Sequence, residues 1–138
     1  MPGGAQQPVP VAATTRADSL TELARLDLLV ERKPDDASLW HARGLLAWQL
    51  SQGKRAIGAK VDREQLRLNQ VADSSLLRAA TLGTDNARYL ADFAVYRSQS
   101  SPIVRAGATR YESRAFERAR ATGDSLVVAE MADKLGMV

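Results

Sequence analysis

The fold of this chain is decided by the stretch Pro34-Asp35-Asp36-Ala37-Ser38-Leu39-Trp40-His41-Ala42-Arg43-Gly44. Residues 84–94 and 122–132 align with this stretch without a gap. Each of the three begins with turn or helix-capping residues and continues into apolar residues. The starts at 34, 84 and 122 are 50 and then 38 residues apart, so the unit recurs with insertions. Such self-similarity predicts a stack of similar helical units. Each unit places a small residue at the same helical position: Gly44, Ala94 and Ala132.

The composition supports this prediction. The 138 residues are 45% hydrophobic and 25% charged, which is typical of one folded domain. Leu, Ala and Arg are abundant and aromatic residues make up 5%, which favours helices over sheets. We therefore expect an all-α fold of about six helices, stacked as antiparallel hairpins.

Capping and breaking residues give the expected helix boundaries. Ser19 and Glu22 have the spacing of a capping box, so the first helix is expected to begin at Ser19 and to end before Pro34. Glycine or proline separates most of the later apolar segments. The remaining helices are expected at 36–52, 62–82, 86–98, 103–121 and 125–135.

Residues 1–17 are expected to form a flexible or partly extended arm in front of a helical domain at 18–138. The arm holds three of the five prolines and shows no apolar periodicity. It is either a terminus without a role or a segment that docks onto a neighbouring subunit. Such arms often follow an export signal or a membrane anchor in bacterial proteins, which favours an exported bacterial protein. No run approaches the roughly 18 apolar residues of a membrane span.

The repeated unit resembles the tetratricopeptide repeat. Trp40 and Gly44 look like the first-helix signature of one unit, and Leu90 and Ala94 look like that of the next. Arg43 departs from the pattern, because leucine is usual at its position. The resemblance implies a superhelical stack, and a six-helix bundle without curvature is the competing arrangement.

The resemblance also implies a concave groove, lined by the first helix of each pair. Such a groove would contain both polar and apolar side chains and would suit an extended peptide or a helix. Asp92 and Glu130 would stand where the family uses basic residues to hold a carboxylate, so capture of an acidic tail is not expected. The implied groove residues are His41, Leu45, Trp48, Gln49, Arg88, Asp92, Val95, Gln99 and Glu130.

Two of these residues have alternative interpretations. Trp48 is either a ligand anchor or a packing residue against the 54–60 insertion, because large aromatic side chains serve both purposes. His41 is either a pH-sensitive contact or a solvated surface residue, and we expect the solvated state.

The positive charge, +3 in total, is dispersed rather than concentrated in a stripe. Lys54, Arg55 and Lys60 form the one basic patch without nearby acids, while the arginines of 103–121 are expected to pair with Glu112 and Glu117 of the same helix. This distribution argues against a nucleic-acid partner.

Catalytic and metal-binding motifs are absent from the sequence. There is no cysteine and one histidine, so thiolate and multi-histidine metal sites within one chain are excluded. No nucleophile or phosphate-loop motif occurs, and no cofactor is implied. The sequence therefore predicts a non-enzymatic module that binds a protein or peptide partner. The alternative is a subunit that self-assembles through the unpaired ends of the stack and the N-terminal arm.

Overall fold

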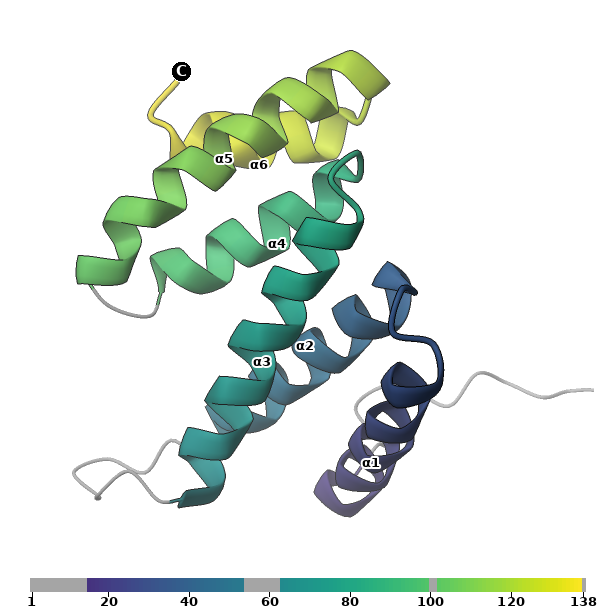
Figure 1. Cartoon of the computed structure of the whole chain (residues 1–138). Coiled ribbons are helices and arrows are strands. Elements are labelled where there is room, and N and C mark those ends of the chain that lie inside the picture. The colour runs from purple at the N-terminus through teal and green to yellow at the C-terminus, as the bar shows by residue number, and fades with distance from the viewer. Residues whose placement is uncertain (1–14, 54–62, 100–101, 138) are drawn as a thin grey trace, which may run out of the picture.

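The computed structural model describes residues 15–53, 63–99 and 102–137, and these residues form six α-helices without a strand (Figure 1). The expected all-α class is confirmed. The observed boundaries lie within three residues of the expected ones. The helices are α1 (Arg16–Arg32), α2 (Ala37–Gly53), α3 (Arg63–Leu82), α4 (Ala87–Ser98), α5 (Pro102–Thr122) and α6 (Ser125–Lys134).

The three aligned units begin their helices in the same way. Helices α2, α4 and α6 each start three residues after the aligned starts at 34, 84 and 122. The residue before each helix accepts a hydrogen bond from a backbone N–H of the first turn. Such a cap satisfies a donor that the helix leaves unpaired. The acceptor side chains are Asp36 (3.4 Å from Leu39 N), Asn86 (3.2 Å from Tyr89 N) and Asp124 (3.1 Å from Val127 N).

Helix α1 begins earlier than the sequence suggested. Thr15 accepts a hydrogen bond from the Asp18 backbone at 3.0 Å, and Asp18 accepts one from the Thr15 backbone at 3.4 Å. This capping box replaces the expected one at Ser19 and Glu22, because the Ser19 backbone N–H already donates to the Thr15 carbonyl at 3.0 Å. Residues 1–14 of the expected arm lie outside the described residues.

Consecutive helices pack against each other along the whole chain. The pairs α2/α3 and α4/α5 are antiparallel and make the most extensive contacts, and α4 also touches α6 (Figure 1). Gly44 permits the close approach of α2 and α3: a Cβ atom there would lie 2.7 Å from Leu76 Cγ. None of the described helices combines the length and the apolar character that a membrane span requires.

Arg43, the departure from the repeat pattern, joins three helices. Its guanidinium lies 2.7 Å from Asp27 of α1 and donates to the Ser75 hydroxyl of α3 at 3.1 Å. Ser75 is fully buried, so this hydrogen bond satisfies a hydroxyl that water does not reach. The arginine thus has a structural role that a leucine at this position would not supply.

Candidate functional site

A chain of ion pairs links α2, α4 and α6. His41 Nε2 of α2 lies 2.6 Å from Asp92 Oδ2 of α4. Arg88, one turn before Asp92, contacts Asp92 Oδ1 at 3.2 Å and Glu130 of α6 at 2.8 Å. Four of the nine predicted groove residues therefore lie together and contact one another.

The environment of this chain is partly buried. The side chains of His41 and Asp92 are 16% and 17% exposed, and the His41 ring packs on the Tyr89 ring at 4.6 Å. The expectation that His41 is solvated is wrong, because Asp92 and Tyr89 occupy its surroundings. Partial burial acts to lower the pKa of Arg88, but its hydrogen bonds to Glu130 and Asp92 outweigh burial and raise the pKa.

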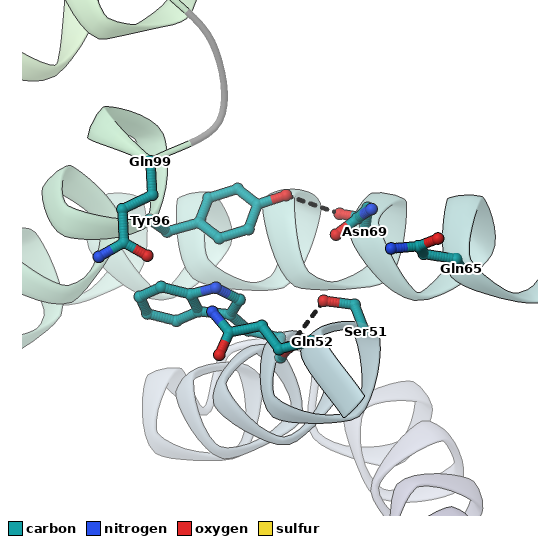
Figure 2. A pocket seen from close by; sticks show the side chains of 7 residues that line it. Ser51, Gln52, Gln65, Asn69, Tyr96 and Gln99 are labelled. Carbon is teal, nitrogen blue, oxygen red and sulfur yellow. Dashed lines mark hydrogen bonds between the residues drawn. The ribbon is translucent and has the colours of Figure 1, made fainter. Parts of the chain in front are cut away.

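A pocket of about 710 Å³ lies near the C-terminal ends of α2 and α4. Its lining comes from the last turns of α2, the first half of α3 and the last turn of α4, so it joins two successive helix pairs (Figure 2). This volume falls within the usual range of ligand-binding pockets. The lining residues are Trp48, Ser51, Gln52, Gln65, Asn69, Tyr96 and Gln99.

Two aromatic rings form one corner of the pocket. Trp48 and Tyr96 meet edge to face, with ring centroids 5.4 Å apart and an interplanar angle of 88°. The Tyr96 hydroxyl donates to the Asn69 backbone carbonyl at 3.0 Å, which fixes the ring against α3 (Figure 2). Trp48 is half-buried and lines the pocket. It therefore packs on Tyr96 and also lines the pocket, whereas the 54–60 insertion lies outside the described residues.

The other lining residues are polar but uncharged. Ser51 is satisfied by the Trp48 carbonyl at 2.7 Å. In the described part of the chain, no hydrogen-bond partner occurs for the side-chain carboxamides of Gln52, Asn69 and Gln99. Each carboxamide offers both N–H donors and a carbonyl acceptor. This lining suits a neutral ligand that itself alternates donors and acceptors, as a peptide main chain does.

The remaining predicted groove residues lie elsewhere. Leu45 and Val95 are half-buried against the hydrophobic core, and Gln49 is exposed outside the pocket. Of the nine, Trp48 and Gln99 line the pocket. The predicted basic patch, Lys54, Arg55 and Lys60, lies outside the described residues.

Sequence reasoning missed five of the seven lining residues. The repeat resemblance places a groove on the first helix of each pair, whereas Gln65 and Asn69 belong to α3, the second helix of its pair. Their spacing of four residues, which puts two carboxamides on one face of a helix, was the available signal. The five are Ser51, Gln52, Gln65, Asn69 and Tyr96.

The arginines of α5 do not pair as expected. Arg118 contacts Asp85, outside its own helix, at 3.4 Å and also donates to the Asp85 carbonyl at 3.1 Å. Arg110 and Arg114 lie over the Tyr111 ring, 5.6 and 5.8 Å from its centroid. In the described part of α5, no ion pair joins two residues of the helix. The intrahelical pairing predicted for Arg118 is wrong.

Among the described residues, no three histidine or carboxylate side chains lie close enough together to hold a metal ion. A scan against protein-family models found no match, and searches of curated proteins and of solved structures found no significant similarity.

Proposed function

We propose that this protein is a non-enzymatic interaction module of tetratricopeptide-like helix pairs. It binds an extended, uncharged segment of a partner protein in the pocket between α2, α3 and α4. The observation that carries this proposal is the combination of a Trp48–Tyr96 corner with three carboxamides that lack partners among the described residues. Aromatic side chains supply binding energy at a low entropic cost, and carboxamides can form hydrogen bonds with the N–H and C=O groups of a peptide main chain.

The charges around the pocket support an uncharged ligand. His41, Arg88, Asp92 and Glu130 contact one another and none of them lines the pocket, so they supply no counter-charge to a ligand bound there. No described lining residue of the pocket is charged. Burying an unpaired ligand charge against such a lining is unfavourable, and this selects against acidic and basic segments.

The ion-pair chain also supports a preformed pocket. It links α2 to α4 at His41 and Asp92, and α4 is one of the elements that line the pocket. The Tyr96 hydroxyl independently ties α4 to α3. A pocket whose walls are already held in place costs less to order on binding.

The test is peptide selection on the intact protein followed by affinity measurement. Peptides selected from a displayed random library are labelled, and their binding is followed by fluorescence anisotropy. We expect Trp48→Ala to weaken binding by about tenfold or more. We expect Gln52→Ala to weaken it by roughly fivefold, the effect of one hydrogen bond of about 1 kcal/mol.

Gln49→Ala is the matched control, because Gln49 is an exposed glutamine of the same helix outside the pocket. Its affinity should equal that of the wild type. Binding should also change little between about 50 and about 500 mM salt, since exposed charges make no contribution. Selected peptides that bind Trp48→Ala and Gln52→Ala as tightly as the wild type would refute the proposal.

A second candidate function is self-association through α6. Helix α6 aligns with α2 and α4, but among the described residues no later helix covers the side that α2 and α4 bury. Leu126 is 64% exposed on α6, and a pocket of about 310 Å³ between α5 and α6 is lined by Val128 and Ala129 among others. Apolar surface of this kind is typical of a contact between subunits.

Light scattering over a concentration series tests this second candidate. Leu126→Glu should shift an oligomer towards the monomer, because it places a charge in the contact. Leu66→Glu is the control: Leu66 of α3 is similarly exposed, at 51%, but belongs to a helix in the middle of the order rather than at either end. A protein that is monomeric at every concentration tested would rule out self-association through α6.

A further inference from the structure

We propose that the exposed side of α3 and α5 binds the phosphate backbone of a nucleic acid, independently of the base sequence. This surface lies outside the pocket, so the inference goes beyond the proposed function and does not rest on it. We call the surface the arginine face, and its members are Arg63, Arg67 and Arg78 of α3 with Arg110 and Arg114 of α5.

The exposed charges are distributed unevenly over the helices. In their described parts, α2 and α4 expose no charged side chain, whereas every exposed charged side chain of α3 is an arginine. The described part of α5 exposes Arg110, Arg114 and Arg120, with Glu117 as its exposed acid. The second helix of each pair therefore carries an excess of positive charge on its surface.

The other acidic residues of α3 and α5 are paired with other helices or buried. Glu64 contacts Arg16 of α1 at 2.9 Å, and Asp73 contacts Arg97 of α4 at 3.0 Å. Glu112 is buried, with an exposed fraction of 6%. Counted along the sequence, these carboxylates offset the arginines, which is why the sequence suggested a dispersed charge. In the structure they lie away from the arginine face.

The arginines of this face are almost free of carboxylate partners. Arg67 lies 3.9 Å from Asp27, and its side chain is still 64% exposed. The other four members form no ion pair with any residue that the structure describes. Exposed positive charges of this kind attract a polyanion and release its condensed counterions on binding.

The α3 part of the face is a straight row. Its exposed residues recur at spacings of three and four, which places them on one side of the helix. At a rise of 1.5 Å per residue, the row covers about 22 Å between its first and last arginine. One strand of a duplex presents a phosphate about every 3.4 Å, so the row can follow about six successive phosphates. No acid interrupts the row, which consists of Arg63, Arg67, Gln70, Ser74, Arg78 and Thr81.

The α5 part of the face is connected to α3 through α4. Arg97, which pairs with α3, lies 5.0 Å from the centroid of the Phe93 ring. Phe93 in turn meets Tyr111 of α5 edge to face at 4.7 Å. Arg110 and Arg114 lie over this same Tyr111 ring. Figure 1 shows α3 in front of α2 and α5 in front of α6, so the second helices of the two pairs lie on one side of the fold.

The chemistry of the face favours phosphate groups. The planar guanidinium group of arginine can donate two parallel hydrogen bonds to one phosphate. The row on α3 contains no apolar side chain, whereas the centre of a protein–protein interface depends on apolar and aromatic anchors. This difference favours a nucleic acid over an acidic protein. Contacts with phosphates carry no sequence information, so binding should not depend on the base sequence.

The arginine face and the pocket lie on opposite sides of α3. Successive residues of an α-helix are rotated by about 100°, so residues two apart point in nearly opposite directions. Gln65 follows Arg63 by two positions and Asn69 follows Arg67 by two, and both Gln65 and Asn69 line the pocket. A nucleic acid and a peptide can therefore bind at the same time.

The experiment measures the binding of labelled oligonucleotides to the intact protein by fluorescence anisotropy. Single-stranded and double-stranded RNA and DNA of about 20 nucleotides and mixed sequence are titrated between about 50 and about 300 mM salt. Five phosphate contacts should give a slope of log K against log salt of about −3.5 for single strands and about −4.5 for duplexes. RNA and DNA share the phosphate chemistry, and the two arms show which of them the face prefers.

Arg63→Gln combined with Arg78→Gln should bring the slope closer to zero by about 1.4 for single strands and about 1.8 for duplexes. Arg25→Gln combined with Arg32→Gln is the matched control, because it removes the same charge from exposed positions of α1. Both control residues lie on the side of α1 away from Asp27, the residue next to Arg67. The control should keep the wild-type slope. Circular dichroism melting curves should show both variants folded, since all four side chains are exposed.

Three outcomes would overturn the inference. They are no binding of any oligonucleotide at the lowest salt concentration, a wild-type slope in the Arg63→Gln/Arg78→Gln variant, and equal binding of an oligoglutamate with the same number of charges. The last outcome would assign the face to an acidic polypeptide. Trp48→Ala should leave oligonucleotide binding unchanged, and Arg63→Gln/Arg78→Gln should leave peptide binding unchanged. The inference and the proposed function can therefore fail separately.

Discussion

Gly44→Ala should destabilise the protein, although alanine is the better helix former. A Cβ atom at position 44 would lie 2.7 Å from Leu76 Cγ, 2.8 Å from Leu76 Cδ2 and 3.0 Å from the Leu76 backbone nitrogen. Leu76 is fully buried, so its side chain has no free volume into which it can rotate. The added methyl group must therefore push α2 and α3 apart.

Two opposing terms set the magnitude. Replacing glycine by alanine within a helix stabilises it by about 1 kcal/mol. Forcing an extra methyl group into a tightly packed interior costs about 1–3 kcal/mol, and the contact with the Leu76 backbone favours the upper part of this range. We expect a net loss of about 1 kcal/mol in the free energy of unfolding, and a larger loss for Gly44→Val.

Urea unfolding followed by far-UV circular dichroism measures this change. Ala42→Gly, at an exposed position of the same helix, measures the effect of helix propensity alone. It should lower the free energy of unfolding by about 1 kcal/mol. In a Leu76→Ala background the contacts with the Leu76 side chain disappear and only the 3.0 Å approach to its backbone nitrogen remains, so Gly44→Ala should then destabilise the protein less than it does in the wild type. A stabilising effect of Gly44→Ala in the wild type, or additivity with Leu76→Ala, would refute the steric argument.

Three further predictions concern polar contacts. Asp92→Ala should cost about 1–3 kcal/mol of stability in urea unfolding, because it leaves the partly buried His41 without this partner and removes one of the two carboxylates that Arg88 contacts. Glu130→Ala should cost less than about 1 kcal/mol, since its side chain is 42% exposed. Arg43→Leu should cost about 1–3 kcal/mol by the same assay, as it leaves the buried Ser75 hydroxyl without its partner, and no loss would contradict this role. Hydrogen bonds from the Ser38 hydroxyl and from the Leu39 and Ser38 backbone N–H groups lower the pKa of Asp36 below its usual value of 3.8. The ionised Asp36 therefore stabilises the protein at pH values above 3.8, and this stabilisation is lost as the pH falls through the lowered pKa of the folded state. Asp36→Asn should therefore lose less stability than the wild type between about pH 5 and about pH 2, measured from urea midpoints, and an equal loss would contradict the assignment.

The helix starts could be predicted from the sequence because local chemistry determines them. Asp36, Asn86 and Asp124 can each satisfy backbone donors within four residues, whatever the rest of the chain does. The start of α1 was less certain, because Thr15 and Ser19 both precede an acidic residue at the capping-box spacing. In the structure Thr15 and Asp18 form the capping box, and the Ser19 backbone N–H donates to the Thr15 carbonyl inside the helix.

The candidate site was only partly predictable, since it depends on contacts between distant segments. The repeat alignment put His41, Arg88 and Asp92 in one predicted groove, but it could not show that their side chains would contact one another. The contribution of α3 depends on how closely α2 and α3 approach, and this follows from Gly44 and Leu76 rather than from a motif. The pocket is therefore a property of packing.

The ion pairs that join α2, α4 and α6 share their central members. Asp92 binds both His41 and Arg88, while Arg88 binds both Asp92 and Glu130. A substitution at either outer position removes one link, whereas a substitution at either central position removes two. Over evolutionary time the outer pair can therefore vary one residue at a time, and the central carboxylate and guanidinium should be exchanged or lost together.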